Sequence, residues 1–107
     1  MENKAKEYDA IVVGSGSGTR IVDNALAHGM RVALVDRGPL GGTCLMVGCI
    51  PSKKLIVPAD RVMEAREAEK LGVEVDVTHI DFEAITERMR RGTREGQERV
   101  REGIEAA

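Results

Sequence analysis

The sequence predicts an α/β fold built on one β-α-β unit, with a sheet that the chain leaves incomplete. Two short apolar runs, residues 8–13 and 31–36, have the nearly continuous hydrophobic character of parallel strands covered on both faces. A glycine-rich turn and a helical stretch lie between them. After residue 36 the chain adds helices but no third buried strand, so we expect a two-stranded sheet with open edges.

The turn after the first strand has the pattern of a dinucleotide-binding site. Residues 14–19, Gly-Ser-Gly-Ser-Gly-Thr, open a helix that runs to His28 and is closed by Gly29. The first two glycines allow a tight turn and a close approach of backbone to a pyrophosphate at the helix N-terminus. Thr19 stands where a third glycine or alanine is usual, so we expect helix and strand to lie slightly further apart. This is a Rossmann-like βαβ pattern.

An acidic residue completes this pattern at the end of the second strand. Asp36 lies 22 residues after Gly14, where a carboxylate can bind ribose hydroxyls. The alternative is an ordinary glycine turn, with Asp36 a solvated charge at a strand end. The candidate cofactor-binding residues of this unit are Gly14, Gly16, Ser17, Gly18, Thr19, Asp36 and Arg37.

Residues 41–53 contain both cysteines of the chain. Cys49-Ile50-Pro51 is typical of a helix start, because proline is pre-organised for the first helical turn. A cysteine there lies at the positive end of the helix dipole, which favours thiolate. Four residues separate Cys44 from Cys49, which allows the approach that a disulfide needs. Spacing alone fits either a redox pair or two small buried apolar residues.

The whole stretch resembles the redox motif of the class I pyridine nucleotide–disulfide oxidoreductases, which include dihydrolipoamide dehydrogenase, mercuric reductase and mycothione reductase. It matches G-G-T-C-x-N-x-G-C-x-P-S/T-K at every fixed position except Met46, where the family has asparagine. The resemblance implies that residues 1–107 form the N-terminal portion of an FAD-binding domain, without the NAD(P)H and interface domains. Cys44 and Cys49 would be the catalytic disulfide, with Cys49 nearer the flavin and Cys44 attacking substrate.

The resemblance also assigns the cofactor and its contacts. In the family the first βαβ unit holds FAD, so Asp36 would bind the adenosine ribose. Gly42 and Thr43 would lie along the pyrophosphate and ribityl chain, and Lys53 would approach the flavin ring. NAD(P)H would exchange hydride with the flavin, and a lipoamide-like or other small disulfide would be the substrate.

Helices are expected beyond the redox motif. Apolar spacing predicts a helix that kinks at Pro58 and ends at Leu71-Gly72. Residues 73–77 alternate in polarity and predict a short extended segment with one covered face. Asp81 is expected to cap a final helix.

That final helix carries an apolar stripe formed by Phe82, Ile85, Met89, Gly92, Gly96, Val100 and Ile104. The two glycines each cost about 1 kcal/mol relative to alanine in a helix. We expect a second backbone to pack closely against them, since such a contact would offset this cost.

Composition excludes several classes of function. The 107 residues suffice for one domain, 42% are hydrophobic and the net charge is −2, so nucleic acid and anionic membrane are not expected partners. No run approaches the roughly 20 apolar residues of a membrane span, and no signal-peptide pattern opens the chain. These features predict a cytoplasmic protein. His28 and His79 lack ligand-like companions, so no metal site is expected.

Three hypotheses for the function follow. The first is an FAD-dependent, NAD(P)H-linked disulfide oxidoreductase, similar to dihydrolipoamide dehydrogenase and present here as an N-terminal fragment. The second is a stand-alone nucleotide-binding or thiol-redox module without hydride transfer. The third is a gene remnant or a subunit completed by a separate chain. In each case this chain alone is expected to self-associate and to be inactive with NAD(P)H, because its sheet edges are open and no nicotinamide site can be assigned.

Overall fold

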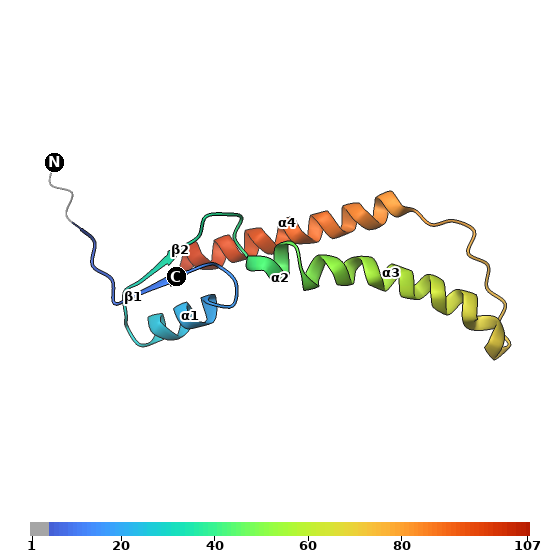
Figure 1. The fold of residues 1–107 in the computed structure, drawn as a ribbon, viewed down its shortest axis with the longest axis horizontal. Helices are drawn as coiled ribbons and strands as arrows, with labels where there is room; N and C mark the ends of the chain where they lie inside the picture. Colours follow the sequence, from blue (N-terminus) through green and yellow to red (C-terminus); the bar gives the residue numbers. More distant parts are fainter. Residues whose placement is uncertain (1–4) are drawn as a thin grey trace.

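The computed structural model describes residues 5–107, and its elements follow the predicted order (Figure 1). The first part of the chain consists of β1 (Ala10–Val13), α1 (Thr19–Ala27) and β2 (Val32–Val35). The second part consists of α2 (Gly42–Met46), α3 (Cys49–Glu67), the short 3-10 helix η1 (Ala68–Leu71) and α4 (Phe82–Ala106). The α/β fold with an incomplete parallel sheet is therefore confirmed.

The sheet consists of β1 and β2 paired in parallel, with Ala10 opposite Val32 and Val13 opposite Val35. Helix α1 contacts both strands and covers one face, where Ala25 is buried. Alternate residues of β1 are open to solvent: Ile11 is 64% exposed and Val13 is 81% exposed. The prediction that both faces are covered is therefore wrong. The end of α4 reaches the sheet beside α1, on the face that α1 covers, and the rest of α3 and α4 extends away from it (Figure 1).

Helices α3 and α4 form a long arm. Helix α3 continues through Pro58, and the kink expected there stays a prediction. The following η1 ends at Leu71, with Gly72 at φ +78° as its C-cap, as predicted for this end. Asp81 caps α4, as predicted, because its carboxylate accepts a hydrogen bond from the Ala84 N–H at 2.9 Å. The segment 73–77 between the helices lacks the covered face that its alternation predicts, and its extended backbone stays a prediction. It forms no strand, and Val73 and Val75 are about half exposed, because no described strand lies beside it to pair with.

The molecule is elongated, measuring 74 × 29 × 19 Å (Figure 1). Its radius of gyration is 21.2 Å, whereas a compact chain of this length has about 13 Å. Its accessible surface is 8693 Å², against about 5,800 Å² for a typical folded protein of this mass. Much apolar surface on the sheet and on the arm is therefore left in contact with solvent.

The apolar stripe of α4 rests on α2 and α3. Gly96 is buried, and a Cβ atom there would lie 2.6 Å from Leu45 Cδ1 of α2. A Cβ atom at Gly92 would lie 2.9 Å from Lys54 Cε of α3. The glycines therefore make room for side chains, and the predicted close approach of a second backbone is wrong.

Two matched substitutions test whether α4 rests on Leu45 at this point. Gly103 has open space around it. The change Gly103→Leu should therefore raise the thermal unfolding midpoint, because leucine favours a helix over glycine by about 0.8–1 kcal/mol. The change Gly96→Leu should lower the midpoint, because it competes with Leu45 for space and overpacking costs about 1–3 kcal/mol. Thermal unfolding followed by circular dichroism measures both. Equal upward shifts would contradict this packing.

Candidate functional site

The glycine turn (residues 14–19) and the start of the redox stretch (residues 41–53, which contain both cysteines) enclose a hollow of about 800 Å³. Its lining combines residues from both loops: Val13, Gly14, Ser15, Gly16, Ser17, Gly18, Arg20, Asp36, Gly41, Gly42, Thr43 and Cys44. Most of the predicted cofactor residues therefore lie around one space. Among the predicted residues that do not line it are Thr19, Arg37, Cys49 and Lys53.

A direct backbone contact joins the two loops. Gly42 has φ +71°, and a Cβ atom there would overlap Gly16, whose backbone N would lie 3.0 Å away. Both requirements, a positive φ and the absence of a side chain, select glycine at position 42. The glycine turn and the redox stretch consequently form one surface made largely of backbone.

The close approach of α1 to the sheet occurs at Gly18, where a Cβ atom would lie 3.0 Å from Val12 Cγ1. Thr19, which stands in the third glycine position of the motif, turns its side chain back toward the loop. Its hydroxyl donates to the Gly16 carbonyl at 2.8 Å. The threonine therefore closes the turn, while the neighbouring glycine provides the tight packing.

Asp36 is held by hydrogen bonds from the glycine turn and from its own loop. It accepts hydrogen bonds from the Ser15 backbone N–H at 2.8 Å, from the Ser15 hydroxyl, and from the Gly38 N–H at 3.0 Å. The Ser15 hydroxyl is the main cause that lowers the pKa of Asp36 from 3.8 to about 2, with the backbone bonds from Gly38 and Ser15 adding to it. Asp36 is therefore ionised at neutral pH.

Two residues with polar side chains line the hollow but were not predicted from the sequence, Ser15 and Arg20. Ser15, only 3% exposed, occupies a variable position of the glycine motif, where sequence reasoning attends to the glycines. Arg20 lies in the first turn of α1 and lines the hollow. A cation that directly follows a glycine-rich turn is a signal that could have identified it, since the expected ligand carries a pyrophosphate.

The two cysteines occupy the junction between α2 and α3. Cys44 lies within α2 and Cys49 begins α3, as predicted for that helix start, and both are exposed free thiols. Gly48 permits the tight turn between them, because a Cβ atom there would lie 2.9 Å from the Thr43 carbonyl oxygen. Hydrogen bonding with the Cys49 side chain, and secondarily loss of solvation, raises the pKa of the Cys44 thiol. Cys44 is the cysteine that lines the hollow.

The chemistry of this hollow fits a dinucleotide. The backbone of residues 16–18, just before α1, offers N–H groups to phosphates, whereas the first N–H groups of α1 already donate to carbonyl oxygens of the turn. Arg20 adds positive charge. The ionised Asp36 offers acceptors to ribose hydroxyls. Any side chain at Gly42 would collide with the Gly16 backbone and separate the two loops that line the hollow.

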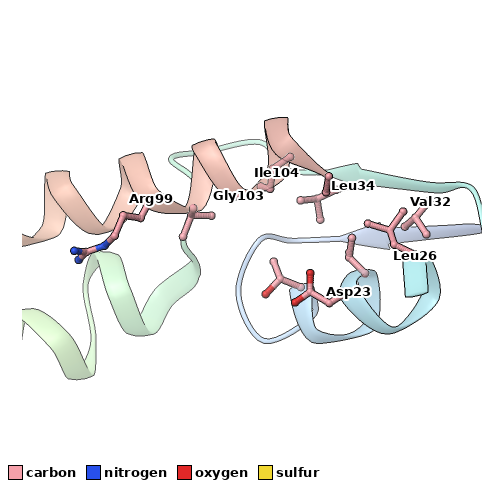
Figure 2. A pocket seen from close by; sticks show the side chains of 11 residues that line it. Asp23, Leu26, Val32, Leu34, Arg99, Gly103 and Ile104 are labelled. Atoms are coloured by element: carbon pink, nitrogen blue, oxygen red, sulfur yellow. The ribbon is translucent and has the colours of Figure 1, made fainter. Parts of the chain in front are cut away.

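A second hollow of about 410 Å³ lies between α1, β2 and the end of α4 (Figure 2). Its walls are mainly apolar, with Leu26, Leu34 and Ile104 among them, and Asp23 and Arg99 also line it. No set of three potential metal-ligating side chains gathers anywhere in residues 5–107. Within the same range, no helix has the length and apolar character needed to cross a membrane.

Comparison with known proteins identifies the family. Residues 8–103 match the family model described as pyridine nucleotide-disulphide oxidoreductase. The chain is 41% identical over 85 residues to the dihydrolipoyl dehydrogenase of Bacillus subtilis, an alignment covering 78% of this chain and 18% of that protein. It is 40% identical over 97 residues to the dihydrolipoyl dehydrogenase of Chlamydia pneumoniae, covering 87% of this chain and 21% of that protein.

The chain thus spans about a fifth of the length of these curated relatives. The matched region contains both the glycine turn and the cysteine pair, the two parts of the hollow described above. The chain therefore belongs to the pyridine nucleotide–disulphide oxidoreductase family.

Proposed function

We propose that this chain supplies the FAD-binding and redox-cysteine portion of an NAD(P)H-linked disulfide oxidoreductase of the dihydrolipoyl dehydrogenase type. The observation that supports this most strongly is the contact of Gly42 with Gly16, since it places Cys44 beside the candidate dinucleotide hollow. The substrate class is a small disulfide such as lipoamide, in keeping with the names of the relatives.

The residues of the hollow have separate tasks in this proposal. Gly14, Gly16, Ser17 and Gly18 hold the pyrophosphate through backbone contacts at the start of α1. Arg20 offsets the negative charge of the pyrophosphate, and Asp36 accepts hydrogen bonds from the adenosine ribose. Gly42 and Thr43 lie along FAD from the pyrophosphate to the ribityl group, and Lys53 approaches the flavin ring. Thr19 holds the glycine turn, and Arg37 lies near the adenosine ribose.

FAD, when bound, supplies electron transfer between NAD(P)H and the cysteine pair. Reduction of the Cys44–Cys49 disulfide takes up two electrons and two protons and gives two thiols. The Cys44 thiolate then attacks the substrate disulfide, forming a mixed disulfide and releasing one substrate thiol. Attack by Cys49 on the Cys44 sulfur releases the second thiol and restores the pair. Dehydrogenation of a dithiol is the reverse sequence.

The environment of Cys44 sets the pH dependence of this exchange. Because interaction with Cys49 raises its pKa, Cys44 keeps its proton to higher pH than an isolated thiol. Loss of that proton must precede its attack on substrate, since the thiolate is the nucleophile. The rate of exchange should therefore rise with pH through the range in which Cys44 deprotonates.

The proposed disulfide is tested by mild oxidation. The chain should lose two protons and form an internal Cys44–Cys49 bridge without covalent dimers, because the turn at Gly48 brings the two side chains together. Mass spectrometry of the intact protein measures this. The variant Cys49→Ser should show no such loss, and two persistent thiols in the wild type would contradict the proposal.

The cofactor assignment is tested with Asp36→Ala. This change should weaken FAD binding about ten- to a hundredfold, because hydrogen bonds to a charged group are lost. Flavin fluorescence titration measures the dissociation constant. The matched control is Asp23→Ala, an exposed acid of α1 that does not line this hollow, and it should leave the affinity unchanged.

If FAD binds equally well to both variants, Asp36 has no role in the cofactor site. If wild-type protein forms the disulfide but binds no FAD, the chain is a thiol-redox module without flavin chemistry, and the proposal fails.

A further inference from the structure

We propose that Ser15 is a positioning residue that ties the redox stretch to the carboxylate at the end of β2, so that the ribose end of the site and the loop bearing Cys44 are coupled. Its hydroxyl donates to Asp36 Oδ2 and accepts a hydrogen bond from the Gly41 N–H at 2.9 Å. This inference rests on the proposed function for the identity of the ligand. The link itself is a property of the chain alone.

The direction of both hydrogen bonds is fixed by chemistry. The ionised carboxylate has no proton to give, so the single hydroxyl proton of Ser15 points to Asp36. A lone pair is then left for the Gly41 N–H. Hydrogen bonds in such a chain polarise and strengthen one another. Ser15 is 3% exposed, whereas Asp36 is exposed, so the hydroxyl is shielded from water while the carboxylate stays open to a ligand.

The link acts at the point where the redox stretch begins. Gly41 directly precedes α2, which carries Cys44, and its φ of +122° restricts the position to glycine. Leu45 of the same helix packs back on Gly41. Anchoring of the Gly41 N–H therefore fixes the first residue of a short rigid segment that ends at the cysteines.

The backbone alone would not make this link. The Ser15 N–H bonds Asp36 whatever the side chain, but the bond to Gly41 requires the hydroxyl. Alanine at this position would leave the Gly41 N–H without its acceptor. It would also remove the hydroxyl hydrogen bond that contributes most to the low pKa of Asp36. The serine thus supplies a connection between cofactor turn and redox stretch that glycine or alanine cannot provide.

A ligand that hydrogen-bonds Asp36 should therefore be sensed at Gly41. A ribose hydroxyl donating to Asp36 would immobilise the carboxylate, and with it the Ser15 hydroxyl. The Gly41 N–H would then open to solvent less often. Binding of FAD should thus slow hydrogen exchange at Gly41, and only when residue 15 carries a hydroxyl.

The link is first tested without cofactor, by NMR on the whole chain. In Ser15→Ala the pKa of Asp36 should rise from about 2 toward its ordinary 3.8. Exchange of the Gly41 amide hydrogen should accelerate about tenfold, as expected for loss of one hydrogen bond. Ser17→Ala, at an exposed serine of the same turn, should change neither value. An unchanged pKa and unchanged exchange in Ser15→Ala would overturn the proposal.

A second pair of variants guards against a folding defect. Ser15→Thr and Ser15→Val have nearly the same shape and differ in the hydroxyl. Threonine should restore a low pKa of Asp36 and slow exchange at Gly41, whereas valine should not. Equal behaviour of the two would show that packing rather than the hydroxyl positions the loop.

The coupling is then tested with FAD, and binding is followed independently by flavin fluorescence. Slower exchange at Gly41 on binding in the wild type, but not in Ser15→Ala, supports the proposal. Binding without any change at Gly41 in the wild type overturns the coupling. If the wild type binds no FAD, the proposed function and the coupling to it both fail, while the cofactor-free measurements still decide whether the link exists.

Discussion

The site depends on the contact between two glycines, Gly16 of the glycine turn and Gly42 of the redox stretch. No side chain fits between them, so the two loops meet through backbone alone. This contact sets Cys44 at the edge of the hollow. Helix α2 begins at Gly42, and its Leu45 reaches Gly96 of α4, so the stretch that meets the glycine turn also packs on the helical arm.

Stability and site geometry are separable in this chain. The hollow is held by short-range backbone contacts and by the hydrogen bonds of Ser15 and Asp36. The sheet and the arm, by contrast, bury little: Ala25 is the one apolar side chain classed as buried in residues 5–107. Exposed strand residues such as Ile11 and Val13 offer a surface for further burial, and self-association through it stays a prediction.

Patterns among neighbouring residues were enough to predict the helices, the strands and much of the candidate site. The β-α-β unit, the cap at Asp81 and the helix start at Cys49 follow from patterns within a few residues, and the structure confirms them. Contacts between distant segments were harder to predict. That Leu45 and not a backbone fills the space at Gly96 depends on how α2 is oriented. Ser15 gains its role only because Asp36 and Gly41 converge on it.

We propose that the glycine turn and the redox stretch form one cofactor site, held together by the contact of Gly42 with Gly16. The most direct measurement is FAD affinity, by flavin fluorescence, of Gly42→Ala beside Gly38→Ala, an exposed glycine with open space around it. We expect Gly38→Ala to bind FAD like the wild type, and Gly42→Ala to lose at least about tenfold in affinity because overpacking separates the loops. Equal affinity of the two variants would contradict it.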